Sequence, residues 1–154
     1  MTIDQICANY EAATETFLVA AAAVPASRLD LHAQGEWSAR QVIHHMADSE
    51  TQSYARLRRL LCEPEGSLVQ GYDEAAWARN ETLGYTSLPV EHSLAVVRAV
   101  RGATLDILRR LSIADLARFG EHSESGRYDV ATWVETYCDH PSNHARQLSA
   151  SATN

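Results

Sequence analysis

The sequence contains no lysine, and its thirteen basic residues are all arginines distributed along the chain. With a formal net charge of -7, it lacks the clustered basic surface that nucleic acids and anionic membranes require. No stretch approaches the roughly 18–20 apolar residues of a membrane span. The first residues show no basic region followed by an apolar run, so we expect no secretion signal and a cytoplasmic location. These absences argue against a nucleic acid or a membrane as partner.

Cysteine is also scarce. Cys7, Cys62 and Cys138 are odd in number, lie far apart and form no Cys-x-x-Cys pair. Neither a disulfide framework nor a sulfur-based zinc site is indicated, and a reducing compartment fits. Strand-like alternation, internal repeats and low-complexity tracts are absent as well. At 154 residues, with 45% hydrophobic content, the chain is expected to form one domain over residues 1–154.

Four amphipathic segments have the three- and four-residue spacing of helices. They cover residues 2–22, 38–62, 89–111 and 130–150. Thr2 is a plausible N-cap for the first, and Ser38 with Gln41 forms a capping-box pattern for the second. The connections 63–88 and 112–128 are long, and each is expected to carry a short helix, the first capped by Asp73; residues 122–126 are turn-like. The sequence therefore predicts an all-α fold, a four-helix bundle with two longer connections carrying short helices.

Two histidines four residues apart, His140 and His144, share the inward stripe of the last predicted helix with Trp133 and Tyr137. This spacing lets both imidazoles reach one metal ion. The pair His44-His45 could supply a third ligand, and helical periodicity alone does not decide between its two members. A lone inward histidine is more often a core residue, but burying two without a partner costs the desolvation of each, which a shared divalent ion offsets. Three neutral imidazoles suit Zn, Ni, Fe or Cu and leave one position open for water or substrate.

From Trp37 onward, the chain resembles the DinB/YfiT-like superfamily, damage-inducible-type four-helix proteins with a metal site. The matching stretches, in order, are Trp37-Ser-Ala-Arg-Gln-Val-Ile-His-His45-Met-Ala-Asp-Ser-Glu50, Tyr72-Asp73 with Trp77, His122-Ser-Glu124-Ser-Gly126, and His140 through His144 with Gln147. The resemblance implies a metal held by three histidines. In the family's pattern the first ligand immediately precedes a Leu/Met-Ala-Asp segment, which selects His45, and His140 and His144 match the other two.

The resemblance also implies a function. The family includes proteins described as metal-dependent hydrolases and others that transfer low-molecular-weight thiols such as bacillithiol or mycothiol. We therefore expect a divalent transition metal, either Zn or Ni, with Fe or Cu as alternatives. We also expect a small-molecule substrate or thiol, and a homodimer. In both reactions the metal lowers the pKa of a bound water or thiol and presents it as a nucleophile. The alternatives are a non-catalytic stress-response or binding protein with a structural metal, and a protein without metal.

Further site candidates follow from spacing and from the resemblance. Asp48 and Glu50 follow His45 on the same helix, where either could orient a ligand or act as a general base, although a solvated acidic face explains them equally well. The family positions Tyr72, Trp77 and His122 are expected to line the pocket, although packing explains the two aromatics equally well. Arg56 or Arg101 could contribute to binding an anionic or sugar-bearing thiol.

Two positions in the last motif depart from expectation. Asn143 stands where several relatives carry an extra histidine, which a three-ligand site does not require. Pro141 directly follows His140, and a proline inside a helix removes one hydrogen bond and clashes with the preceding turn. The helix is therefore expected to kink, or to restart with Asp139 as a cap. A sharp break would remove His140 from the site.

Overall fold

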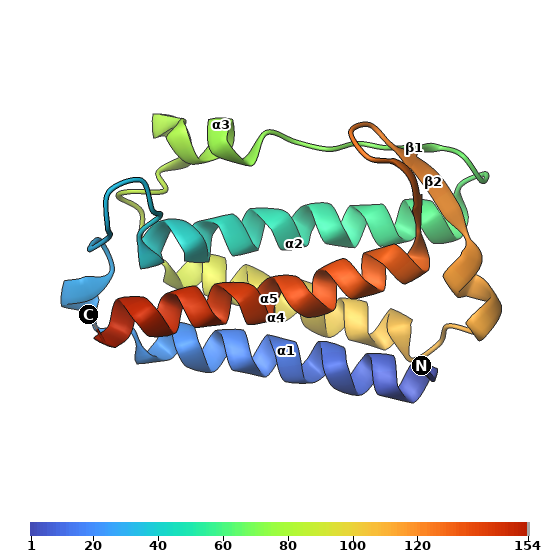
Figure 1. Ribbon diagram of the computed structural model, residues 1–154, viewed down its shortest axis with the longest axis horizontal. Helices are drawn as coiled ribbons and strands as arrows, with labels where there is room; N and C mark the ends of the chain where they lie inside the picture. The colour runs from blue at the N-terminus through green and yellow to red at the C-terminus, as the bar shows by residue number, and fades with distance from the viewer. Residues whose placement is uncertain (154) are drawn as a thin grey trace.

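The computed structural model describes residues 1–153, and four long helices form most of it (Figure 1). These are α1 (Ile3–Ala23), α2 (Ala39–Cys62), α4 (Glu91–Leu108) and α5 (Val130–Thr153). α5 packs against α1 and α2, and α4 packs against the same two helices on the other side of the bundle. The predicted four-helix bundle is confirmed. No helix in the described part is both long and apolar enough to cross a membrane.

The direction of the four helices explains the first long connection. In Figure 1, α1 and α5 run one way through the bundle, and α2 and α4 run the opposite way. α2 and α4 are thus parallel neighbours, so the chain has to return along the bundle after Cys62 before α4 can begin. A helix as long as α2 spans about 36 Å. The returning segment carries the short helix α3 (Glu74–Arg79) and the 3-10 helix η2 (Glu81–Leu83).

The helix starts follow the side-chain caps that the sequence predicts. Thr2 accepts a hydrogen bond from the Gln5 amide at the start of α1, and the Gln5 side chain bonds back to the Thr2 amide. Ser38 and Gln41 form the same reciprocal capping box at the start of α2. The Asp73 side chain accepts from a backbone amide in the first turn of α3. Each cap satisfies an amide that the helix itself leaves without a partner.

A small three-stranded sheet closes one end of the bundle, in addition to the helices that the sequence predicts. β1 (Leu68–Val69) pairs in parallel with β2 (Phe119–His122), which pairs antiparallel with β3 (Gly126–Asp129). These strands have two to four residues, too few for an alternating pattern to emerge. The turn predicted at 122–126 joins β2 to β3. Gly120 has no room for a side chain, because a Cβ there would lie 2.6 Å from the Ser67 carbonyl oxygen.

Two further 3-10 helices lie in the connections, η1 (Ala26–Arg28) between α1 and α2, and η3 (Ile113–Ala117) between α4 and β2. The second agrees with the short helix predicted in the segment 112–128.

Two hydrophobic clusters fill the two ends of the bundle, with buried polar groups between them. Met46 and Leu148 belong to the first cluster, and Tyr10 and Trp133 belong to the second. Trp133 is fully buried, and its indole N–H donates to the Ser53 carbonyl oxygen at 3.1 Å. The buried polar groups on the helices come from α2 and α4 and include His45, which faces two half-buried histidines of α5.

Candidate metal centre

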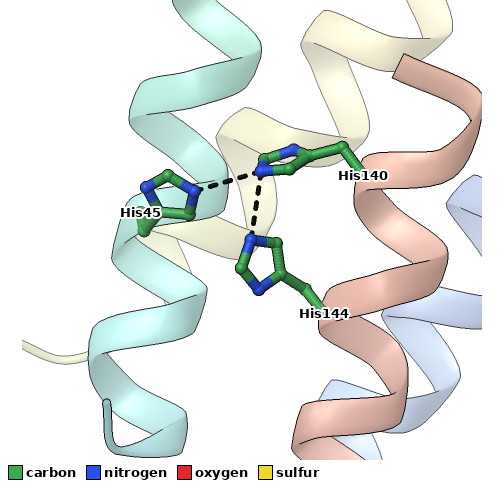
Figure 2. Close-up of side chains that lie close together, drawn as sticks. All are labelled: His45, His140 and His144. Carbon is green, nitrogen blue, oxygen red and sulfur yellow. Dashed lines mark hydrogen bonds between the residues drawn. The ribbon is translucent and has the colours of Figure 1, made fainter. Parts of the chain in front are cut away.

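Three imidazoles from two helices meet at one point between α2 and α5 (Figure 2). The Nε2 atom of His140 lies 3.1 Å from Nε2 of His45 and 3.0 Å from Nε2 of His144. Nε2 of His140 carries at most one proton, so it cannot donate hydrogen bonds to both neighbours. Three nitrogens bound to one zinc ion at 2.0–2.1 Å would lie roughly 3.3 Å apart. The arrangement is therefore close to what a shared metal ion requires, and poor as a set of hydrogen bonds.

The surroundings keep these imidazoles neutral at pH 7. Burial lowers the pKa of His45 to about 3, with a smaller contribution from the neighbouring His144. The pKa of His140 is lowered to about 3, first by burial and then by the other two histidines. Burial also lowers the pKa of His144. Metal ligation requires the neutral imidazole, so the protein presents these side chains in the form that binds an ion.

One consequence is that the metal-free protein is expected to lose stability in acid. The pKa of His45 falls from 6.5 in the unfolded chain to about 3 in the folded one. The stabilisation is fully present above about pH 6.5 and is lost as the pH falls from there through about 3, at about 1.4 kcal/mol per pH unit. Urea unfolding in the presence of a chelator at several pH values would measure this slope. The variant His45→Gln should show a shallower slope, and equal slopes would contradict the assignment.

The nitrogens turned away from the centre differ in their partners. Nδ1 of His144 lies 3.1 Å from Oε1 of Gln147. The amide oxygen only accepts, so Nδ1 carries the proton and Nε2 is left with its lone pair toward the centre. Nδ1 of His45 and Nδ1 of His140 are buried without a hydrogen-bond partner within residues 1–153. The Trp37 ring meets the His45 ring edge-on at 5.0 Å between centroids.

His44 faces a different part of the molecule. Its Nδ1 lies 2.8 Å from the Ser93 hydroxyl, and its Nε2 lies 3.1 Å from the Leu88 carbonyl oxygen. A carbonyl oxygen only accepts, so Nε2 is the donor and the neutral ring accepts from Ser93 through Nδ1. Both nitrogens of His44 are thus occupied on the α4 side of α2. The choice between His44 and His45, which periodicity left open, follows from this geometry.

Pro141 lies inside α5, and the helix continues through it from Val130 to Thr153. The predicted restart at Asp139 does not occur. His140 and His144 keep helical register, as the short distance between their Nε2 atoms shows. Because Pro141 has no N–H, the carbonyl group of Tyr137, four residues earlier, lacks its usual helical donor. The Arg101 guanidinium supplies two donors to that oxygen, each at 3.2 Å.

Comparison with known proteins agrees with the fold. A sequence model of the DinB superfamily matches residues 9–148. The chain belongs to the DinB superfamily. A protein of Oceanobacillus iheyensis named as a candidate metal-dependent hydrolase is 36% identical over 116 residues, which is 75% of this chain. A Bacillus cereus protein named in the same way is 31% identical over 116 residues, also 75% of this chain. The matched region spans 65% of the length of each relative, so their activity is a proposal for this chain.

A solved structure extends the similarity to nearly the whole DinB domain. YfiT from Bacillus subtilis superposes with a TM-score of 0.87 at 26% identity, covering 97% of this chain and 85% of YfiT. It is described as a probable metal-dependent hydrolase with an unusual four-helix bundle topology. In this chain, α2 and α4 are neighbours that run in the same direction, whereas a simple up-and-down bundle has antiparallel neighbours.

The two carboxylates proposed as catalytic groups are not members of this histidine cluster. Asp48 accepts a hydrogen bond from the Tyr85 hydroxyl at 2.6 Å, and both line a separate cavity of about 200 Å³ together with His44. Glu50 is fully buried and forms an ion pair with Arg101, with 2.6 Å between Oε1 and Nη1. Within residues 1–153, the cluster of metal-ligand side chains consists of the three histidines alone. Each carboxylate thus has a partner outside the cluster, and a catalytic role for either one stays a prediction.

The family positions expected to line the pocket lie on the connections that cover α2. The Tyr72 and Trp77 rings pack on each other with 4.6 Å between centroids. His122 packs on Tyr128, with centroids 5.5 Å apart. The aromatic ring contacts of the histidine cluster come from Trp37 and from Tyr137, whose ring centroid lies 6.3 Å from that of His140. These ring contacts fit the packing alternative for Tyr72 and Trp77, and a pocket-lining role for these two residues and His122 stays a prediction.

The two arginines suggested for substrate binding have different surroundings. Arg101 is 1% exposed, so it cannot touch a substrate, and that suggestion was wrong. Arg56 is half-buried and donates to the Tyr137 hydroxyl at 3.0 Å and to the Gln70 carbonyl oxygen.

A cavity of about 450 Å³ lies between the connection after α1 and the end of α5, and it borders the histidine cluster through two of its lining residues, while none of the three histidines lines it. Trp37 and Gln147 line it, and each of them also contacts one of the three histidines. Arg28 and His32 supply polar groups to its wall. The sequence patterns did not identify Trp37 or Arg28 as site residues, because their contact with the centre depends on how the connection folds back onto α5.

Proposed function

We propose that this DinB protein is a metal-dependent enzyme that activates water or a low-molecular-weight thiol as a nucleophile, a hydrolase or a thiol S-transferase. One observation carries the proposal, the convergence of three neutral imidazoles on a single point. Closed structural zinc sites usually have four protein ligands, whereas catalytic sites keep a position open. Among the described residues no fourth histidine, cysteine or carboxylate joins the cluster. This donor set supports catalysis over a purely structural ion.

The chain's own residues would bind and orient the ion. His45, His140 and His144 would hold a divalent transition metal through their Nε2 atoms, and we propose zinc or nickel, with iron or copper as alternatives that imidazole also suits. When bound, such an ion lowers the pKa of water or a thiol and polarises a carbonyl group. Gln147 holds the proton on Nδ1 of His144 and thereby keeps the ligating nitrogen free. Trp37 covers His45 and limits its access to water.

The adjoining cavity is the proposed place for the substrate. Its volume of about 450 Å³ is in the range of small-molecule sites. The names of the relatives favour hydrolysis, since those from Oceanobacillus iheyensis and Bacillus cereus and YfiT are all described as metal-dependent hydrolases of candidate or probable status. Thiol transfer is proposed because it uses the same activation of a bound nucleophile. The homodimer and the cytoplasmic location stay predictions.

The test begins with metal content. Protein purified without an affinity tag is expected to contain, or to take up, about one divalent ion per chain, measured by elemental analysis. The loaded protein is then assayed for hydrolysis of p-nitrophenyl acetate and for transfer of L-cysteine to 1-chloro-2,4-dinitrobenzene, a step in which sulfur displaces chloride and a proton is released. Turnover that disappears on chelation and returns with the ion supports the proposal. A stoichiometric ion without turnover in either assay would favour a structural metal instead.

A further inference from the structure

A single buried arginine connects all four long helices at the level of the histidine cluster. Arg101 lies on α4, and its Nε donates to the Thr14 hydroxyl of α1 at 2.6 Å. Its Nη1 meets Glu50 of α2 at 2.6 Å, and its Nη2 donates to the Tyr10 carbonyl oxygen of α1 at 3.1 Å. Both terminal nitrogens also reach the Tyr137 carbonyl oxygen of α5. The guanidinium group therefore has a partner on each of the other three helices.

The contact with Tyr137 exists because of Pro141. In an uninterrupted helix the Tyr137 oxygen would accept from the amide of residue 141, but proline has no N–H. The vacant acceptor faces the core, where it has to find another donor, and Arg101 supplies it. Tyr137 is three residues before His140, and Glu50 is five residues after His45. The arginine thus ties the backbone beside one proposed ligand to the helix that carries another.

Stability alone does not account for this arrangement. The Arg101 and Glu50 side chains are 0% exposed, and the second oxygen of Glu50 has no partner within residues 1–153. Buried ion pairs are costly to desolvate, and apolar side chains of similar volume often stabilise a core as well or better. Apolar side chains cannot donate hydrogen bonds. The arginine can, and it donates to the Tyr137 carbonyl group, which its own helix leaves without a donor.

We propose that Arg101 is a positioning residue for the three-histidine site. By holding the Tyr137 carbonyl group that Pro141 leaves free, and by pairing with Glu50, it fixes α5 against α2 so that Nε2 of His140 stays within 3.1 Å of the other two Nε2 atoms. This inference rests on the proposed metal site, and it adds a role for residues that touch neither metal nor substrate.

The test compares Arg101→Lys with wild type and with Arg98→Lys, an exposed position on the same helix. A lysine keeps the positive charge, but its compact ammonium cannot replace the planar guanidinium toward four partners at once. We expect zinc affinity, measured by chelator competition, to fall roughly 10- to 100-fold in Arg101→Lys and to stay unchanged in Arg98→Lys. The absorption spectrum of bound Co(II) should change in Arg101→Lys alone, while circular dichroism of the metal-free protein stays the same.

The decisive variant is Arg101→Lys/Pro141→Ala. Alanine returns an amide N–H to the Tyr137 oxygen, so zinc affinity and the Co(II) spectrum should recover most of the way to wild type. Should Arg101→Lys not fold, Arg101→Met/Glu50→Leu leaves no buried charge and serves in its place, again with and without Pro141→Ala.

Wild-type affinity in the arginine variant would overturn the positioning role. So would a loss that Pro141→Ala does not restore, because Arg101 would then act by holding the bundle as a whole. A wild-type protein that binds neither Zn nor Co(II) would overturn the proposed metal site and this inference together. If the wild-type protein binds zinc and the Arg101 variant binds it equally well, the inference alone is overturned and the metal site stands.

Discussion

Replacing His144 with alanine is expected to abolish stoichiometric metal binding, because it removes one of three ligands. Four-ligand zinc sites bind with about 10–16 kcal/mol, or roughly 2.5–4 kcal/mol per ligand. One ligand is therefore worth roughly 100- to 1,000-fold in affinity. Chelator competition and elemental analysis after dialysis would measure the loss. His144 is half-buried at the edge of the cluster, so its truncation should leave the bundle folded.

Two control variants make this result specific. His92 is exposed on α4, and His92→Ala should keep wild-type affinity. His44→Asn tests the neighbour of the proposed ligand. It should lower stability, because it disturbs the bonds to Ser93 and Leu88, and yet keep the metal. Retention of a stoichiometric ion by His144→Ala, or its loss in His92→Ala, would contradict the assignment of the ligands.

The second large effect concerns the buried ion pair. Arg101→Met is expected to lower the free energy of unfolding by about 3–5 kcal/mol, because it leaves Glu50 in the core without its partner, where the carboxyl group has to remain charged or take up a proton. It also removes the donors for the Tyr10 and Tyr137 carbonyl oxygens and for the Thr14 hydroxyl. Urea unfolding of the metal-free protein at pH 7 would measure the change, with Arg98→Met as an exposed control on the same helix.

The double variant Arg101→Met/Glu50→Leu separates two contributions to the free energy of unfolding. One is the cost of leaving Glu50 buried without Arg101, and the other is the stabilisation by the ion pair itself. It should recover most of the lost stability, because two apolar side chains replace both partners and no buried charge remains. A double variant as unstable as Arg101→Met would instead mean that the arginine's bonds to α1 and α5 carry the stability.

The helices and their starts could be predicted from the sequence, because the interactions that set them lie within one turn. Thr2 with Gln5 and Ser38 with Gln41 satisfy amides three residues away. The spacing of His140 and His144 likewise places two imidazoles on one helical face whatever surrounds them. The resemblance to the DinB family then supplied His45.

Other features could not be read from local sequence because their partners lie far along the chain. β1 pairs with β2, about fifty residues later, and each strand is too short to show a pattern of its own. Glu50 looked like a general base beside His45, but the bundle turns it inward to meet Arg101. Helical spacing could not decide whether His44 or His45 is the ligand. The packing of α4 against α2 decides it, because His44 bonds to Ser93 and Leu88 there.

Pro141 shows most clearly which features follow from the sequence and which depend on the tertiary structure. The sequence by itself determined that the Tyr137 carbonyl group would lose its helical donor, since proline has no N–H. Whether α5 would then break, and so remove His140 from the centre, depended on whether the core could offer a replacement. Only the tertiary structure decided this, because the donor is the Arg101 guanidinium on another helix, 36 residues before Tyr137 in sequence and held in place by Glu50 and Thr14.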